Sequence, residues 1–176
     1  MNTIENKQTH SMNLKRTKQV LAIVAIISFL MMSTNLLGFN IDAGFSSFDM
    51  LDVKFHYTAG EFYVYFSELT NEMSIAYLNL HLMDYVFIFS FYPLLAMIIW
   101  GMTIQTRKSI RFVFVTLPLV AMFSDLFENI LIDVEMLSST IFDTGMLAGF
   151  FTTLKFSALA FSVIYIIYKL LLSRKR

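Results

Sequence analysis

Four long runs of apolar residues limit the folds that this chain can adopt. No charged residue occurs from Gln19 to Ile41 or from Tyr85 to Thr106. A helix needs about 20 mostly apolar residues to cross a bilayer, whereas the strands of a membrane barrel alternate apolar and polar residues. The sequence therefore predicts an all-α fold, a polytopic membrane protein built on a four-helix transmembrane bundle. The expected spans are about 19–41, 83–106, 111–132 and 145–170.

The composition agrees with a membrane protein. Hydrophobic residues make up 57% of the 176 residues, compared with about 45–50% in soluble domains. The sequence contains no cysteine, which excludes disulfides, thiol catalysis and thiolate zinc sites. The formal net charge of zero gives no reason to expect a nucleic-acid partner. We expect residues 1–176 to form a single membrane domain that uses no cofactor.

Lysine and arginine residues indicate which ends of the spans face the cytoplasm. They cluster before the first span, between the second and third spans, and after the fourth span. The two other connections are acidic and contain a single basic residue, Lys54. Because basic segments stay on the cytoplasmic side, the sequence predicts a multi-pass protein of the cell (cytoplasmic) membrane with both termini cytoplasmic. The first span exceeds the apolar part of a typical signal peptide, and we expect it to remain as an anchor.

The connection 42–82 is predicted to lie on the outer side and to contain a short amphipathic helix. Thr58 and Glu61 have the spacing of a capping box, in which each side chain bonds the backbone amide of the other residue. Aromatic residues follow at helical spacing, beginning with Phe62. Two positions of this helix fit the pattern. It can lie on the outer bilayer surface as an anchor, or over an outward-facing cavity as a lid.

Ionisable residues inside the spans are the most informative feature for function. Asp84, Asp125, Glu128 and Lys155 fall at membrane depth, where charged groups are costly and usually paired or functional. Counting about 1.5 Å per helical residue from the short turns between spans places all four at a similar height in the outer half of the membrane. We expect Lys155 to pair with Asp125, which leaves Glu128 and Asp84 with no obvious cation.

Neighbouring polar residues extend this layer. Asn129 shares a helical face with Asp125 and Glu128, and Tyr92 lies at a nearby level of the second span. In the first span, the polar residues 33–35 reach a similar height, so each of the four spans is expected to contribute. The candidate site for a ligand or a proton therefore comprises Asp84, Tyr92, Asp125, Glu128, Asn129 and Lys155.

Four functions fit such a layer in a chain whose first partner is the lipid bilayer. It can bind or translocate a small cation, a proton or a polar ligand, because carboxylates beside a lysine and a tyrosine can relay protons. It can serve a membrane-embedded enzyme acting on a lipid or isoprenoid head group, with the same residues as acid and base. It can be a structural network between helices, or part of an accessory subunit that works with a membrane protein partner.

A metal site is not predicted. Di-metal sites in helical bundles use Glu-x-x-His pairs on two helices. The nearest match, His81-x-x-Asp84, has the reverse order and occurs on one helix only.

Several short motifs carry a resemblance to a known group. They are Tyr57-Thr58-x-x-Glu61, Asp84 followed by Phe91-Tyr92-Pro93, Asp125-x-x-Glu128-Asn129, and Leu154-Lys155. In these motifs the chain resembles a group of small, uncharacterised bacterial four-span membrane proteins, over most of residues 55–160. The resemblance implies four spans and points to the same polar residues. It implies no activity.

Overall fold

The computed structural model describes residues 2–33, 50–138 and 144–173, with all side chains in these ranges except those of residues 2–12 and 52. The described chain is helical and contains no strand. Two short elements, the 3-10 turn η2 (Leu51–Val53) and the helix α2 (Ala59–Glu68), lie between the first and second long helices. The long helices are α1 (Asn2–Ser33), α3 (Asn71–Met102), α4 (Lys108–Leu137) and α5 (Gly145–Ser173).

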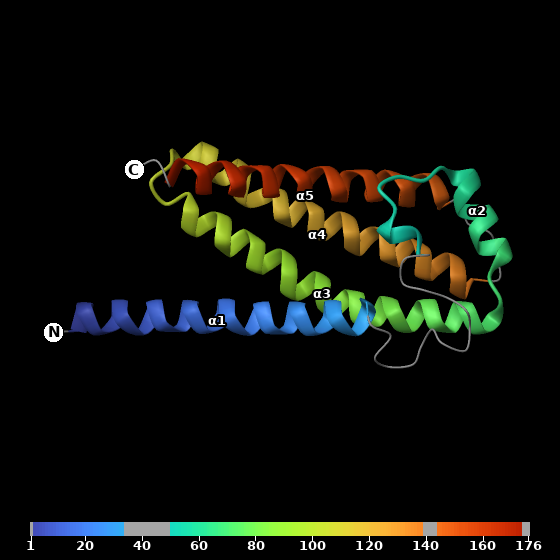
Figure 1. Ribbon diagram of the computed structural model, residues 1–176, viewed down its shortest axis with the longest axis horizontal. Helices are drawn as coiled ribbons and strands as arrows, with labels where there is room; N and C mark the ends of the chain where they lie inside the picture. The colour runs from blue at the N-terminus through green and yellow to red at the C-terminus, as the bar shows by residue number, and fades with distance from the viewer. Residues whose placement is uncertain (1, 34–49, 139–143, 174–176) are drawn as a thin grey trace.

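All four long helices are long and apolar enough to cross a membrane, in α1 over the part Asn13–Ser33. They run alternately in opposite directions along the length of the molecule (Figure 1). α4 packs against both α3 and α5, whereas α1 packs mainly against α3. The prediction of an all-α, multi-pass membrane protein with a four-helix bundle is therefore confirmed.

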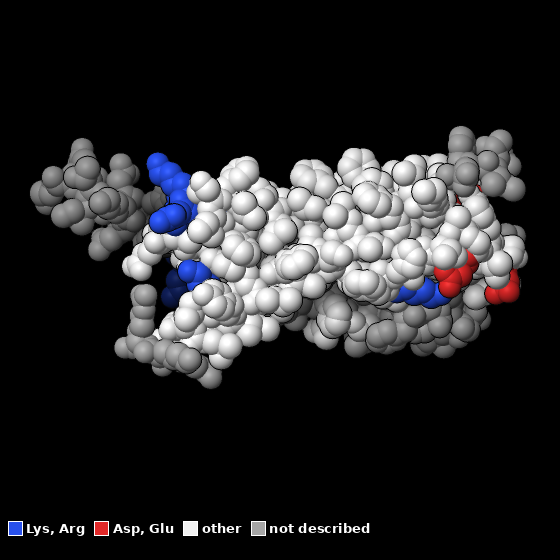
Figure 2. Space-filling model, turned by 90° about the horizontal axis from the view of Figure 1, so that it is seen from above, with Lys and Arg blue, Asp and Glu red and all other residues white. Residues whose placement is uncertain are grey.

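The two ends of the bundle differ in charge and in covering. α2 lies across one end (Figure 1), which we call the α2 end. The opposite end holds the turn from α3 to α4, with Arg107 and Lys108, and the last turns of α5, with Lys169. We call it the basic end. Figure 2 shows Lys and Arg residues at the basic end, and toward the α2 end it shows Asp and Glu residues with Lys or Arg atoms beside them.

The helix that contains the second predicted span, 83–106, begins before that span. α3 starts at Asn71, where the Thr70 hydroxyl accepts a hydrogen bond from the Met73 amide at 3.2 Å. The cap satisfies an amide that has no partner within the helix. Residues 71–82 of the predicted connection 42–82 therefore form the first turns of α3 and lead directly into the predicted span. The helix ends at Met102, because Thr103 and Thr106 enter a tight turn whose amides bond the carbonyls of Trp100 and Thr103.

The capping box at the start of α2 is present as predicted. The Thr58 hydroxyl accepts from the Glu61 amide at 3.2 Å, and a Glu61 carboxylate oxygen accepts from the Thr58 amide at 2.7 Å. The Thr58 hydroxyl also donates to that carboxylate. Because these donors favour the charged form, they lower the pKa of Glu61 below its usual value. The box fixes where the helix begins.

The aromatic face of α2 covers the bundle. Phe62 is fully buried and lies against Tyr57 and Phe66, with ring centroids 6.0 and 4.7 Å away. A Cβ added to Gly145, the first residue of α5, would lie 3.0 Å from the Phe62 ring. The aromatic face of α2 therefore packs on the end of the bundle. Other members of this cluster are Met50, Leu51, Ala76, Tyr77, Leu80, Ile132 and Ala148.

Candidate functional site

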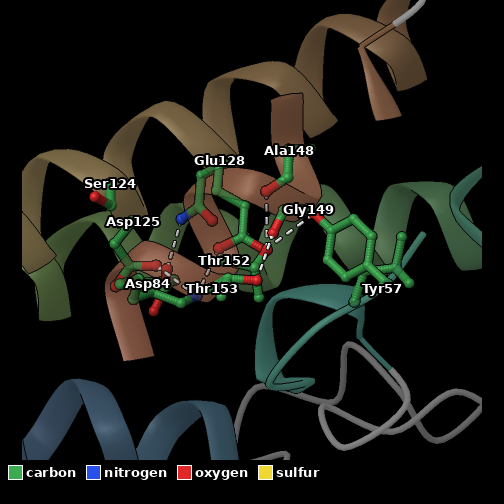
Figure 3. A network of polar contacts seen from close by, with 12 residues as sticks. Tyr57, Asp84, Ser124, Asp125, Glu128, Ala148, Gly149, Thr152 and Thr153 are labelled. Atoms are coloured by element: carbon green, nitrogen blue, oxygen red, sulfur yellow. Dashed lines mark hydrogen bonds and ion pairs between the residues drawn. The ribbon is translucent and has the colours of Figure 1, made fainter. Parts of the chain in front are cut away.

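Polar side chains of α3, α4 and α5 meet inside the bundle and form a hydrogen-bonded network (Figure 3). At its centre, the Lys155 ammonium lies 2.9 Å from an Asp125 oxygen and 2.7 Å from a Glu128 oxygen. The expected contact between Lys155 and Asp125 is present. The expectation that Glu128 lacks a cation was wrong, because Asp125 and Glu128 share the α4 face toward α5 and one flexible lysine reaches both.

The other three candidate residues join α3 to α4. The Tyr92 hydroxyl donates to the second Asp125 oxygen at 2.7 Å. The Asn129 amide nitrogen donates to Asp84 at 2.6 Å. All six candidate residues are buried, and Glu128 and Asn129 have no exposed surface at all. The side-chain amide oxygen of Asn129 is buried without a hydrogen-bond partner among the described residues.

Two residues outside the predicted site also hold Glu128. The Tyr57 hydroxyl donates to a Glu128 oxygen at 3.1 Å, and the Thr152 hydroxyl donates to the same oxygen. Burial, assisted by the Glu128 charge, raises the pKa of Tyr57 above its usual value, so the phenol keeps its proton and remains a donor. Figure 3 shows Tyr57 reaching Glu128 from the segment that precedes α2.

Gly149 makes this approach possible. A Cβ at this position would overlap the carbonyl oxygen of Tyr57. The missing side chain lets the Tyr57 backbone lie directly on α5, one turn before Thr152. The sequence contained a signal for this contact. Gly149, Thr152 and Lys155 follow one another at intervals of three residues, and this spacing places neighbouring residues on one face of a helix.

A second polar cluster lies nearer the α2 end. A ring nitrogen of His81, Nδ1, lies 2.7 Å from one Asp133 oxygen, and the Tyr85 hydroxyl donates to the other at 2.6 Å. Asp133 directly follows the predicted span 111–132. α4 continues to Leu137 and keeps Asp133 on the face toward α3. In the described part of the chain, no group of three or more His, Cys, Asp or Glu side chains could hold a metal ion.

Of the polar residues that the first span was expected to contribute, Ser33 alone lies in the described part of the chain. The Ser33 hydroxyl donates to the Phe29 carbonyl of its own helix at 2.7 Å. Thr34 and Asn35, the other polar residues expected at this height, lie outside the described residues, as does the predicted end of this span at residue 41. Within the described part of α1, the residues that approach the network are apolar: Phe29 and Met32.

A pocket of about 320 Å³ opens onto the network. Asp84, Tyr92, Asp125 and Lys155 form its polar wall. The remaining lining is apolar and comes from α1, η2, α3 and α5, and includes Phe29, Met32, Val53, Phe87, Phe91, Phe156 and Leu159. Lys155 also lies 5.1 Å from the centre of the Phe156 ring. Acidic and basic groups therefore face a small space with aromatic walls at membrane depth.

The fold and the site together define a class, namely a four-helix multi-pass membrane protein with a buried acid–base network beside an aromatic pocket. No protein family, curated protein or solved structure matches the chain. The chemistry of the network and its pocket is therefore the basis for a functional proposal.

Proposed function

We propose that the protein binds a proton in the pocket beside Asp125 and passes it along the buried network toward the α2 end. One observation carries this proposal. The titratable side chains Tyr92, Asp125, Lys155, Glu128 and Tyr57 follow one another through hydrogen bonds and ion pairs between 2.7 and 3.1 Å. A chain of such groups within hydrogen-bond distance is what proton transfer in a membrane requires.

The two ends of this series of hydrogen-bonded side chains support a direction of proton transfer. Tyr92, Asp125 and Lys155 line the pocket, whereas Tyr57 lies beneath α2 and contacts Glu128 from the α2 end. The six candidate residues include three carboxyl groups and one amine. Such a group favours the uptake of positive charge, because burying several carboxylates together disfavours their ionisation. A small monovalent cation is the other occupant that this charge distribution suits.

We also propose that the α2 end faces the outside of the cytoplasmic membrane and that both termini are cytoplasmic. The basic end supports this orientation, since Arg107, Lys108 and Lys169 lie there and positive residues favour the cytoplasmic side. The sequence contains no cysteine, so single introduced cysteines can test this orientation. Ser67→Cys should react with an impermeant maleimide in intact cells, and Ser173→Cys only after lysis. The opposite labelling pattern would reverse the assignment.

Proton transfer can be measured with the purified full chain in liposomes that enclose a pH-sensitive dye. The wild type should dissipate a pH gradient faster than protein-free liposomes. Glu128→Gln keeps the size of the side chain but removes its carboxylate, and the flux should fall to the protein-free rate. Glu61→Gln, the same change outside the network, should leave the flux unchanged. Wild-type flux in Glu128→Gln would refute the relay, and flux that follows sodium or potassium gradients would identify a cation instead.

A second candidate function is favoured by the apolar walls of the pocket. Phe29 from α1 and Phe156 from α5 line the space beside Asp84, Asp125 and Lys155, a combination that suits an enzyme acting on the head group of a lipid or isoprenoid. Cells that express the protein should then contain a chemically altered lipid that is absent when Tyr92→Phe is expressed. Identical lipid profiles from the two strains would exclude this reading.

A further inference from the structure

Two further cavities lie at the basic end of the bundle, separate from the pocket beside the network. An apolar groove of about 530 Å³ runs between α4 and α5 and is lined by Ile110, Phe114, Phe161, Ile164 and Tyr165, among others. A polar pocket of about 610 Å³ adjoins it and is lined by Gln105, Thr106 and Ser173, among others. Thr106, Lys169 and Leu172 line both. The groove and the pocket therefore form one continuous site with an apolar part and a polar part.

Lys169 stands where the two parts meet. Its ammonium donates to the Thr106 hydroxyl at 3.2 Å and lies 5.7 Å from the centre of the Tyr165 ring. None of the described residues that line either cavity is acidic. Arg107 and Lys108 are exposed next to Thr106, and Figure 2 shows Lys and Arg at this end. The polar part therefore attracts an anion.

Tyr165 provides an independent sign of a ligand. It is only 6% exposed, and its ring stacks on Phe114 with a centroid distance of 3.6 Å. Its hydroxyl is buried and has no hydrogen-bond partner among the described residues. A buried tyrosine hydroxyl usually has a partner, because losing its bonds to water is unfavourable. Tyr165 is one of the residues that line the groove, and a small shift of its side chain toward the groove would let a ligand there supply that partner.

We propose that this site binds one anionic phospholipid. Its phosphate lies at Lys169 and Thr106, an ester oxygen accepts a hydrogen bond from the Tyr165 hydroxyl, and an acyl chain follows the groove along Phe161 and Ile164. Basic pockets between spanning helices are suited to anionic lipid head groups. The site lies at the opposite end of the bundle from the proton network, and it does not depend on the function proposed for that network.

Native mass spectrometry of the purified full chain in detergent can test this. Dioleoyl phosphatidylglycerol should bind in one saturable step and dioleoyl phosphatidylcholine should not. Lys169→Gln should weaken the binding of phosphatidylglycerol by about fivefold, the size expected for one basic residue near an anionic lipid. Tyr165→Phe removes only the hydroxyl and should weaken it as well. Lys108→Gln is the matched control, because it removes a neighbouring charge that does not line the site, and it should change little.

Three results would overturn the proposal. Equal binding of the two lipids would show that the charge of the head group is not recognised. Equal losses in Lys169→Gln and Lys108→Gln would show that the surface charge as a whole attracts the lipid. Displacement of the lipid by glycerol phosphate at equal concentration would show that the groove adds nothing to the phosphate contact. If Lys169→Gln does not fold, Ser173→Glu at the exposed rim should weaken phosphatidylglycerol binding through repulsion, and unchanged binding in that variant would also refute the site.

Discussion

Toward the α2 end, the buried residues of α3 and α4 include Asp84, Asp125, Glu128 and Asn129, and each bonds a side chain of another element. Toward the basic end, the core consists of apolar and aromatic residues such as Leu95, Ile99 and Tyr165. The buried Ser162 hydroxyl there donates within its own helix, to the Ala158 carbonyl. Hydrogen bonds and ion pairs between helices therefore dominate the interior contacts of the first half, and packing of apolar side chains dominates those of the second.

This difference indicates in which half of the bundle the fold depends on the identity of the buried residues. Lipid is as apolar as a hydrophobic core, so helices in a membrane gain little from apolar burial alone, and they associate through packing and interhelical hydrogen bonds. The network residues can be exchanged only with loss of a partner, whereas the core of the basic end tolerates apolar residues of similar volume. Substitutions in the two halves should therefore differ in cost.

Removal of the central ammonium should have the largest effect. Lys155→Met leaves Asp125 and Glu128 buried without their cation, and we expect a loss of about 3–5 kcal/mol in the free energy of unfolding. Adding Asp125→Leu to Lys155→Met should recover part of that loss. Unfolding in mixed detergent micelles measures both. If the losses of the two single variants simply add, the contact between Lys155 and Asp125 is not a direct pair.

A side chain at Gly149 should have the next largest effect. Gly149→Ala places a methyl group against the Tyr57 carbonyl, and we expect a loss of about 1–3 kcal/mol, as for overpacked cores. Gly60→Ala is the matched control, because its nearest neighbour would be 3.9 Å away and alanine favours a helix. Thermal unfolding of the two variants should separate them. Similar melting temperatures would show that the Tyr57 segment does not rest on α5.

Two buried hydroxyls of α5 test the comparison most directly. Thr152 and Ser162 have no exposed surface, but Thr152 donates to Glu128 on another helix and Ser162 only to its own helix. Thr152→Val should cost about 1 kcal/mol, the usual net contribution of a hydrogen bond. Ser162→Ala should be close to neutral. Equal effects on the free energy of unfolding would remove the distinction between the two halves.

The smallest effect is expected outside the bundle, at the start of α2. The lowered pKa of Glu61 means that its carboxylate stabilises the helix above the pKa of the unfolded chain. This contribution is lost as the pH falls through the lower pKa of the folded state. The protection factors of the α2 amides, which are exchange rates corrected for the intrinsic rate at each pH, should therefore fall in acid in the wild type. In Glu61→Gln they should already be lower at neutral pH and should not fall further in acid, and a persisting fall would assign it to another group.

The spans and the common level of the polar residues could be predicted from the sequence, because both depend only on helical rise and on local apolar runs. The shared face of Asp125, Glu128 and Asn129 follows from helical spacing. The second contact of Lys155 could not be predicted, since height along a helix does not fix the rotation of α5 about its axis. Nor could the contact between Tyr57 and Glu128, which joins residues 71 positions apart through an irregular segment.

The polar face of α4 has a consequence for how the chain enters the membrane. Asp125, Glu128, Asn129 and Asp133 all lie on this one helix, and each acidic residue at the centre of a helix opposes insertion into lipid by about 2.5–3.5 kcal/mol. The partners that satisfy them arrive partly with α5, which is synthesised after α4 and carries Lys155 and Thr152. α4 is therefore stable in lipid only once α5 has packed against it. We expect the hairpin formed by α4 and α5 to insert and fold in a single step.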